Sequence, residues 1–329
     1  MCYARLPSQA MAYVEIVGAG VVGRATGKGL ARWGHRVVFC DVDKKALARL
    51  ACEGYEVCCA RSDPSPAPFA TLICVPTPTV HGEASLKSLW AALARVSKRI
   101  IASASYHLVV IRSTVPPGTT EKAGRFLESV SAKKAGVHFG ICHNPEFLRA
   151  VSAEQDFLEP PLILVGASDN RSATAVRSLY VRPDGSDPPI VVTDPHTSEM
   201  VKYACNLYNA AKISFSNEVW LLCRSLGIDG DAVMSCVSKA AEGMWNPAYG
   251  IRGGSPYGGS CLPKDVEAFL GFVQRHGLQA RLIRGVHEVN KGLELATTAS
   301  ASVRRARAYP GRPLQAPHSP LHPSAATSR

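Results

Sequence analysis

A glycine-rich turn between an apolar run and a helical pattern constrains this chain more than any other feature. The apolar run Val14–Val17 predicts a strand, and Gly18-Ala19-Gly20-Val21-Val22-Gly23 follows it directly. In a βαβ unit, Gly18 permits the tight turn and Gly20 lets the backbone approach a pyrophosphate. Gly23 lets the helix pack closely on the strand. The sequence therefore predicts a dinucleotide site, with Val21 and Val22 beside it at the helix N-terminus.

An acidic residue at the end of the second predicted strand indicates which dinucleotide binds. The strand Arg36–Cys40 is followed by Asp41, about twenty residues beyond the glycines. A carboxylate there accepts hydrogen bonds from the adenosine ribose and repels a 2′-phosphate, so we expect NAD rather than NADP. Lys44 and Lys45 nearby soften that discrimination. A glycine turn in some other α/β domain is the alternative, and the strand, the spacing and the acid together argue against it.

The order of apolar runs predicts the domain organisation. Strands alternating with helices predict an α/β fold, a Rossmann-type doubly wound parallel sheet. Further strands are expected at residues 71–75, 108–111, 137–141, 162–165 and 190–192, and helices at 22–34 and 86–97. From residue 198 a long helical pattern runs to 226, with further helices near 229 and over 264–276. We therefore expect an NAD-binding domain over 1–193, a helical domain over 194–302 and a disordered arginine- and proline-rich tail over 303–329.

Composition and charge argue against several classes of protein. No apolar run is long enough to cross a bilayer and the first residues do not form a signal peptide, so we expect a cytoplasmic protein without a membrane partner. The net charge is +11, but five arginines follow residue 302 and the other charges are interleaved with acids. This distribution is typical of an enzyme of anionic substrates and argues against a nucleic-acid partner. The eleven cysteines lack metal-type spacing, which indicates reduced thiols and no metal site.

Three further strings carry candidate functional groups. CVPTPT (74–79) and RSTVPPG (112–118) each end a predicted strand, where Thr77, Ser113 and Thr114 are placed to touch cofactor or substrate. A Thr-Pro pair that only stops a strand would explain either string alone. YGGSCLPKD (257–265) puts Cys261 at a predicted helix start, where backbone N–H groups, the helix dipole and Lys264 favour a thiolate. A buried cysteine beside a capping Asp265 is the alternative.

Taken together, these strings give the chain a family resemblance. It resembles the UDP-glucose/GDP-mannose dehydrogenases, which oxidise the C6 alcohol of a nucleotide sugar to a carboxylate using two NAD. The resemblance spans roughly residues 12–291 and rests on six strings: GAGVVG, CVPTPT, RSTVPPGT, NPEFLR, EMVKYACN and YGGSCLPKD. It implies a nucleotide-sugar substrate. It also implies an all-α central dimerisation domain after the sheet, with a homodimer formed through the long helix 198–226.

The resemblance also implies roles for individual residues. Cys261 would capture the aldehyde as nucleophile, and Asp265 would assist proton transfer and thioester hydrolysis. Lys202 and Asn206, four apart on one helix face, would hold the sugar and stabilise the developing oxyanion. Thr114 and Glu146 would position the water and act in acid–base steps. The implied substrate-binding residues are Glu146, Phe147, Leu148, Lys202, Asn206, Arg252, Tyr257 and Gly258. The implied cofactor-binding residues are Gly18, Gly20, Val21, Val22, Gly23, Asp41, Thr77, Ser113, Thr114 and Lys264.

Two departures from the family pattern leave alternatives open. Ala150 stands where the family has Glu after the NPEFLR string, and the arginine–proline tail stands where the family has a third domain that binds the nucleotide. A relative that binds NAD and dimerises with little or no turnover is therefore one alternative. A two-electron β-hydroxyacid dehydrogenase, which has no need of a cysteine, is the other. Both UDP-glucose and GDP-mannose are open as substrates.

Overall fold

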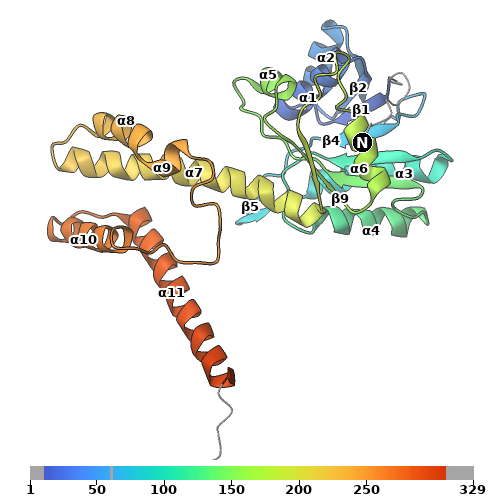
Figure 1. The fold of residues 1–329 in the computed structure, drawn as a ribbon. Coiled ribbons are helices and arrows are strands. Elements are labelled where there is room, and N and C mark those ends of the chain that lie inside the picture. Colours follow the sequence, from blue (N-terminus) through green and yellow to red (C-terminus); the bar gives the residue numbers. More distant parts are fainter. Residues whose placement is uncertain (1–10, 60–61, 309–329) are drawn as a thin grey trace, which may run out of the picture. The chain divides into compact units, whose positions relative to one another are not determined.

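The chain divides into two compact units, the first ending at Tyr208 and the second beginning at Asn209. The computed structural model describes residues 11–59 and 62–308. In that part of the chain, the first unit holds a sheet with helices on both faces and the second unit is built of helices (Figure 1). The predicted fold class, an α/β sheet domain followed by a helical region, is confirmed. None of the described helices has the length and apolar character needed to span a bilayer.

The main sheet of the described chain has eight strands in the order β10-β9-β8-β7-β4-β1-β2-β3. Neighbouring strands pair in parallel except β8 and β9, so the sheet is mostly parallel, and β9 and β10 run opposite to the other six. The strands are β1 (Tyr13–Val17), β2 (Arg36–Asp41), β3 (Glu56–Cys59), β4 (Ala70–Ile73), β7 (His107–Ile111), β8 (Phe139–His143), β9 (Ile163–Ala167) and β10 (Ile190–Thr193). A separate hairpin joins β5 (Thr79–Val80) and β6 (Glu83–Ala84).

Helices cover both faces of this sheet (Figure 1). Apolar side chains are buried between the helices and each face. On one face lie α1 (Val21–Arg32), α2 (Lys44–Cys52), α5 (Ala153–Leu158) and α6 (Asn170–Ser178). The other face is covered by α3 (Lys87–Ala102) and α4 (Thr119–Ser131). The central strands β1, β4, β7 and β8 are therefore buried on both sides, which explains why their sequences are mostly apolar without a regular polar alternation. Their polar members, Glu15, Thr71, His107 and His143, are buried as well.

The glycine turn between β1 and α1 has no room for side chains at two positions. Gly18 has φ of +102°, and a Cβ there would lie 2.6 Å from the carbonyl oxygen of Cys74. A Cβ on Gly23 would lie 1.8 Å from the Gly18 carbonyl oxygen. Only glycine fits at either place, and the helix N-terminus is thereby held directly against the end of the strand.

A 31-residue helix, α7 (Pro195–Ser225), begins where the sequence predicts the change from sheet to helices. Its first turns are fastened to the first unit. Glu199 is fully buried and accepts hydrogen bonds from the backbone N–H groups of Gly118 (2.5 Å) and Thr120 (2.7 Å) at the N-terminus of α4. The division between the two compact units falls inside α7, after Tyr208.

The second unit contains α8 (Gly230–Ala240), α9 (Glu242–Trp245), α10 (Leu262–Arg275) and α11 (Arg281–Ala308). Its buried apolar cluster consists of Leu222, Val273 and Ala280 among the described residues. Helix α11 was not predicted, and it corrects one expectation: residues 303–308, assigned to a disordered tail, are helical. They contain no proline or glycine, so nothing in their sequence stops the helix before Pro310. The remaining tail, 309–329, lies outside the described residues.

Candidate active site

A cleft of about 930 Å³ opens at the carboxyl ends of the strands of the first unit. Its wall includes most of the residues that the sequence predicts to bind the cofactor. These are Gly18, Gly20, Val21, Val22, Asp41, Thr77, Ser113 and Thr114. Gly23 does not line the cleft and instead packs against Gly18. The cleft therefore has the position and the lining expected of a dinucleotide site at the switch point of a doubly wound sheet.

Asp41 both lines the cleft and holds the glycine turn. One carboxylate oxygen accepts a hydrogen bond from the backbone N–H of Ala19 (2.5 Å), and the other accepts from Asp43 N (2.8 Å). Asp43 in turn caps α2 by accepting a hydrogen bond from Lys45 N. The carboxylate is thus fixed at the edge of the cleft, where it can still accept hydrogen bonds through its remaining lone pairs.

The cleft also contains residues that the sequence analysis did not identify. Its wall includes Arg24, Cys40, Arg49, Ser88 and Arg95, together with Lys45, which the sequence analysis named only as a charge near Asp41. Arg24 donates a hydrogen bond to the Ala19 carbonyl (3.0 Å), which places a cation next to the glycine turn. No motif spacing singles out these positions, although the location of 45 and 49 one turn apart on the helix after Asp41 was a usable signal.

The threonine and serine strings are tied together at the floor of the cleft. The Thr77 hydroxyl donates to the Thr114 carbonyl (2.8 Å), and the Ser113 hydroxyl donates to the Val75 carbonyl (2.6 Å). These bonds cross between the segments that follow β4 and β7. They fix Thr114, whose side chain is partly exposed, at the mouth of the cleft.

A buried ion pair lies beside this mouth. The Lys202 ammonium of α7 is 2.8 Å from a carboxylate oxygen of Glu146, and both side chains are largely buried. The other Glu146 oxygen accepts from Leu148 N (2.6 Å), and the Phe147 ring centroid lies 5.7 Å from the ammonium. Glu146 itself lines the cleft. The structure therefore brings Thr114, Glu146 and Lys202 to one place, with Asn206 exposed one turn beyond Lys202.

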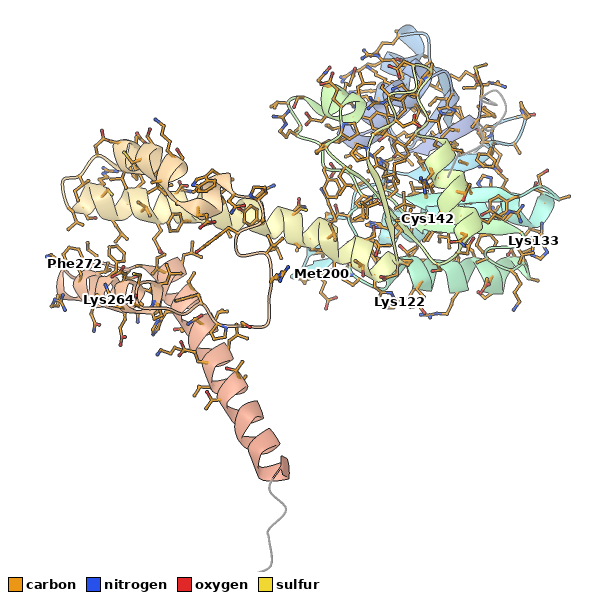
Figure 2. All side chains as sticks on the ribbon, in the orientation of Figure 1. Lys122, Lys133, Cys142, Met200, Lys264 and Phe272 are labelled. Atoms are coloured by element: carbon orange, nitrogen blue, oxygen red, sulfur yellow. The ribbon has the colours of Figure 1, made fainter. Side chains whose placement is uncertain are left out.

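His143, which the sequence analysis did not identify, helps to hold Lys202 in this place. It is fully buried at the end of β8, next to Cys142, and its Nδ1 lies 2.8 Å from the hydroxyl of Ser198 (Figure 2). Burial lowers the pKa of His143 to about 4, helped by the charges of Arg112 and Lys202. The imidazole is therefore neutral near pH 7, and the contact fastens α7 to the sheet one turn before Lys202 without adding a charge.

The second unit carries the cysteine loop. Cys261 is exposed and forms the N-cap of α10, the helix that also bears Lys264 and Phe272 (Figure 2). Lys264 and Asp265 form an exposed ion pair, with Nζ 2.5 Å from Oδ1. The buried-cysteine alternative for Cys261 does not match this exposure. A thiol at a helix N-terminus, open to solvent and next to a lysine, is in a setting that favours reactivity.

The glycine loop before Cys261 is fastened by α11. Tyr257 N donates to the side-chain oxygen of Asn290 (2.7 Å), and the Asn290 amide donates back to the Tyr257 carbonyl (3.2 Å). Asn290 is almost fully buried. Arg252 and Gly258, predicted to bind substrate, are exposed in this loop. Sequence reasoning missed Asn290 because its helix was not predicted.

Comparison with known proteins identifies the family. Residues 62–183 match the NAD binding domain of the UDP-glucose/GDP-mannose dehydrogenase family, and residues 196–292 match its central domain. The chain is 34% identical over 301 residues to GDP-mannose 6-dehydrogenase of Pseudomonas savastanoi pv. phaseolicola, covering 84% of this chain and 67% of that protein. It is 31% identical to UDP-glucose 6-dehydrogenase of Haloferax volcanii, covering 85% and 69%. The matches thus span about two thirds of the length of these relatives.

Solved structures agree with the sequence matches. A ternary complex of GDP-mannose dehydrogenase from Pseudomonas aeruginosa superposes with a TM-score of 0.77 at 28% identity, covering 87% of this chain and 71% of that one. UDP-glucose dehydrogenase from Pyrobaculum islandicum superposes with a TM-score of 0.64 at 36% identity, covering 88% and 70%. The cofactor is therefore NAD, as the sequence predicts. The chain belongs to the UDP-glucose/GDP-mannose dehydrogenase family of NAD-dependent nucleotide-sugar oxidoreductases.

Proposed function

We propose that the chain oxidises the C6 alcohol of a nucleotide sugar, of the GDP-mannose or UDP-glucose type, to the carboxylate in two NAD-dependent steps. The observation that carries this proposal is the buried Lys202–Glu146 pair beside the cofactor cleft. A buried ion pair contributes no more stability than well-packed apolar side chains of the same volume would, so stability alone does not favour this pair at the cleft. Groups of this kind at a cleft mouth are typical of acid–base sites.

The first step converts the alcohol to an aldehyde. NAD supplies the hydride acceptor when bound in the cleft. The alcohol proton passes to a base at the mouth of the cleft, and Glu146 is placed to act in this transfer directly or through a water that Thr114 positions. Lys202 and Asn206 hold the sugar oxygen and stabilise the negative charge that develops on it.

The second step needs a covalent intermediate on Cys261. Its thiolate adds to the aldehyde carbon and forms a thiohemiacetal, which becomes a thioester when it loses a hydride, for which a second NAD in the cleft would be the acceptor. A water then attacks the thioester, the carbon–sulfur bond breaks and the carboxylate product leaves. Asp265 assists the proton transfers of this hydrolysis, and Lys264 adds positive charge near the sulfur. Arg252, Tyr257, Gly258, Phe147 and Leu148 contribute to substrate binding.

We also propose that the working form is a homodimer assembled through α7. Large apolar side chains are exposed along this helix: Met200, Leu207, Tyr208, Ile213, Trp220 and Leu221. A row of exposed apolar residues on one long helix is typical of a helix that packs against another protein surface.

The reaction stoichiometry tests the proposal. Purified protein is incubated with excess NAD and a limiting amount of GDP-mannose or UDP-glucose, and NADH is counted against the sugar consumed. Two NADH and a uronate per sugar are expected from one of these substrates. One NADH per substrate would instead indicate a two-electron dehydrogenase. NAD binding without turnover of either sugar nucleotide would favour a weakly active relative, to which Ala150 already points.

A further inference from the structure

Two cysteines lie opposite one another beside the cofactor cleft. Cys40 of β2 and Cys58 of β3 are register partners on neighbouring parallel strands. Both side chains pack against the same apolar cluster, so they lie on the same face of the sheet. Neighbouring strands are about 4.8 Å apart, which falls within the Cα separations that a disulfide can span. Both thiols are free.

Hydrogen bonds connect these two cysteines through Ser62 and Arg95, and Arg95 lies in the wall of the cleft. The Arg95 guanidinium donates to the Cys40 sulfur (3.5 Å) and to the Ser62 carbonyl (3.2 Å). The Cys58 thiol donates to the same Ser62 carbonyl (3.2 Å). Cys40 and Arg95 both line the cleft. A change in the bonding of either sulfur therefore alters the surroundings of Arg95 at the cofactor site.

The two thiols differ in their access to solvent. Cys40 is fully buried, and burial together with the nearby Glu15 carboxylate raises its pKa far above the usual range. Cys58 lies on the edge strand β3 and is partly exposed. A small oxidant in solution therefore reacts first with Cys58, and the buried Cys40 is the second thiol that forms the disulfide with it.

We propose that Cys40 and Cys58 are a reversible oxidation site, forming a disulfide under peroxide that weakens NAD binding in the adjoining cleft. The Cys58 thiolate attacks the peroxide, a sulfur–oxygen bond forms and hydroxide leaves. The Cys40 sulfur then attacks the Cys58 sulfur, the sulfur–oxygen bond breaks, and the oxygen departs as water with the Cys40 proton. Two electrons pass from the two sulfurs to the peroxide, and a dithiol reductant reverses the change.

The disulfide affects NAD through Arg95. Once the sulfurs are joined, Cys58 no longer donates to Ser62, and Cys40 no longer presents a free thiol to the guanidinium. Arg95 keeps its buried partner Glu15 and its bond to the Ser62 carbonyl, but its contact with the Cys40 sulfur changes and Ser62 is no longer held by Cys58. We expect the dissociation constant of NAD to rise about fivefold after oxidation.

Peptide mapping tests the disulfide itself. Trypsin places Cys40 in the peptide 37–44 and Cys58 in the peptide 50–61, which also contains Cys52 and Cys59. After treatment with hydrogen peroxide and alkylation, we expect these two peptides to be linked and the link to disappear with dithiothreitol. The control is Cys59→Ser, which changes the exposed cysteine next to Cys58. The link should persist in this variant and be absent from Cys58→Ser. A link that survives Cys58→Ser, or no link while Cys58 remains alkylatable, would overturn the proposal.

Calorimetry with NAD tests the consequence and does not depend on sugar oxidation. The unmodified protein and Cys59→Ser should each lose about fivefold in NAD affinity after peroxide and regain it with dithiothreitol. Cys58→Ser should bind NAD equally before and after. Equal NAD affinity of the linked and reduced proteins would refute the coupling. Because only NAD binding is measured, this outcome is separate from a failure of sugar-nucleotide turnover.

Discussion

The two units of this chain bury their apolar side chains to very different degrees. The first unit packs apolar clusters on both faces of its sheet, with many side chains fully buried. In the second unit, the buried cluster of the described residues holds only Leu222, Val273 and Ala280. Large apolar side chains are instead exposed there: Ile213, Leu221, Ile228, Trp245, Phe269, Val286, Val289 and Leu295.

The difference in burial indicates that the two units are stabilised in different ways. A doubly wound sheet buries its strands between its own helices, so the first unit is complete in one chain. A few long helices in contact leave part of their apolar surface exposed, and such surface is usually covered by another protein surface. The exposed apolar surface of the second unit supports the proposed dimer. The cofactor cleft lies in the first unit, and the proposed nucleophile Cys261 lies in the second.

The largest expected effect concerns the nucleophile in the second unit. Cys261→Ser should lower uronate formation by about a thousandfold or more, because the serine alkoxide is a poorer nucleophile and leaving group than the cysteine thiolate. NADH release should stop after the first oxidation. Iodoacetamide should label Cys261 ahead of the other cysteines, since it is exposed at a helix N-terminus.

The matched control is Cys236→Ser, which changes an exposed cysteine on α8. It should retain full activity. A chemical role for Cys261 would be contradicted if the two variants were equally active. It would also be contradicted if iodoacetamide labelled all exposed cysteines at the same rate.

A charge placed on the exposed apolar face of α7 should disrupt the proposed dimer. Ile213 is 62% exposed in the second unit, and Ile213→Lys should weaken self-association by about a hundredfold if that face is buried between two copies. Val137 of the first unit is 59% exposed, and Val137→Lys is the control that should change nothing. Analytical ultracentrifugation of both variants gives the answer. Unchanged association of Ile213→Lys would mean that the second unit is not covered in this way.

The buried acid in the first unit predicts a dependence of stability on pH. Burial alone would raise the pKa of Glu15, but hydrogen bonds and charges from Arg99 and Arg95 outweigh it and lower the pKa to about 2. A carboxyl group with a lowered pKa stabilises the fold above its unfolded value of 4.5, and this stabilisation is lost as the pH falls towards 2. Between pH 6 and pH 3 the loss should be about 2 kcal/mol.

Urea denaturation of the unmodified protein and of Glu15→Gln at both pH values measures this loss. The difference in unfolding free energy between the two proteins should shrink by the same amount on acidification. A difference that is equal at pH 6 and pH 3 would show that the ion pairs with Arg95 and Arg99 do not set the pKa.

The sequence predicts seven of the eight strands of the main sheet because their signals are local, and it misses β3, whose side chains are mostly exposed and form no apolar run. Gly18, Gly23 and Asp41 have fixed spacing along the chain, and each buried strand reads as an apolar run on its own. Helix α11 was missed although its first turns carry a usable signal. Leu282, Val286, Val289 and Leu293 recur there at the spacing of one helix face.

The same reasoning explains which site residues could be found. Lys202, Glu146 and Cys261 stand in recognisable strings. His143, Arg95 and Asn290 matter through contacts between segments far apart in the sequence, to Ser198, Ser62 and Tyr257. No spacing rule connects such pairs, and only the folded chain shows that they meet.

The smallest expected effect sharpens the role of the first unit in cofactor choice. Asp41, Asp43 and Glu146 are the carboxylates in the cleft wall, and Asp41 lies at the end of β2 with Lys45 and Arg49 on the helix that follows. Asp41→Asn removes the charge that repels a 2′-phosphate but keeps an oxygen that can accept from Ala19 N. It should weaken NAD binding by about tenfold and bring NADP to a comparable affinity, since Asp41 then no longer offsets the charges of Lys45 and Arg49. Asp41→Ala should do the same and also lower the melting temperature, because the glycine turn loses its acceptor. Calorimetry with both cofactors on the two variants distinguishes the effect of the Asp41 charge from the effect of its hydrogen bond to Ala19 N. Equal affinity of the unmodified protein for NAD and NADP would show that Asp41 does not select the cofactor.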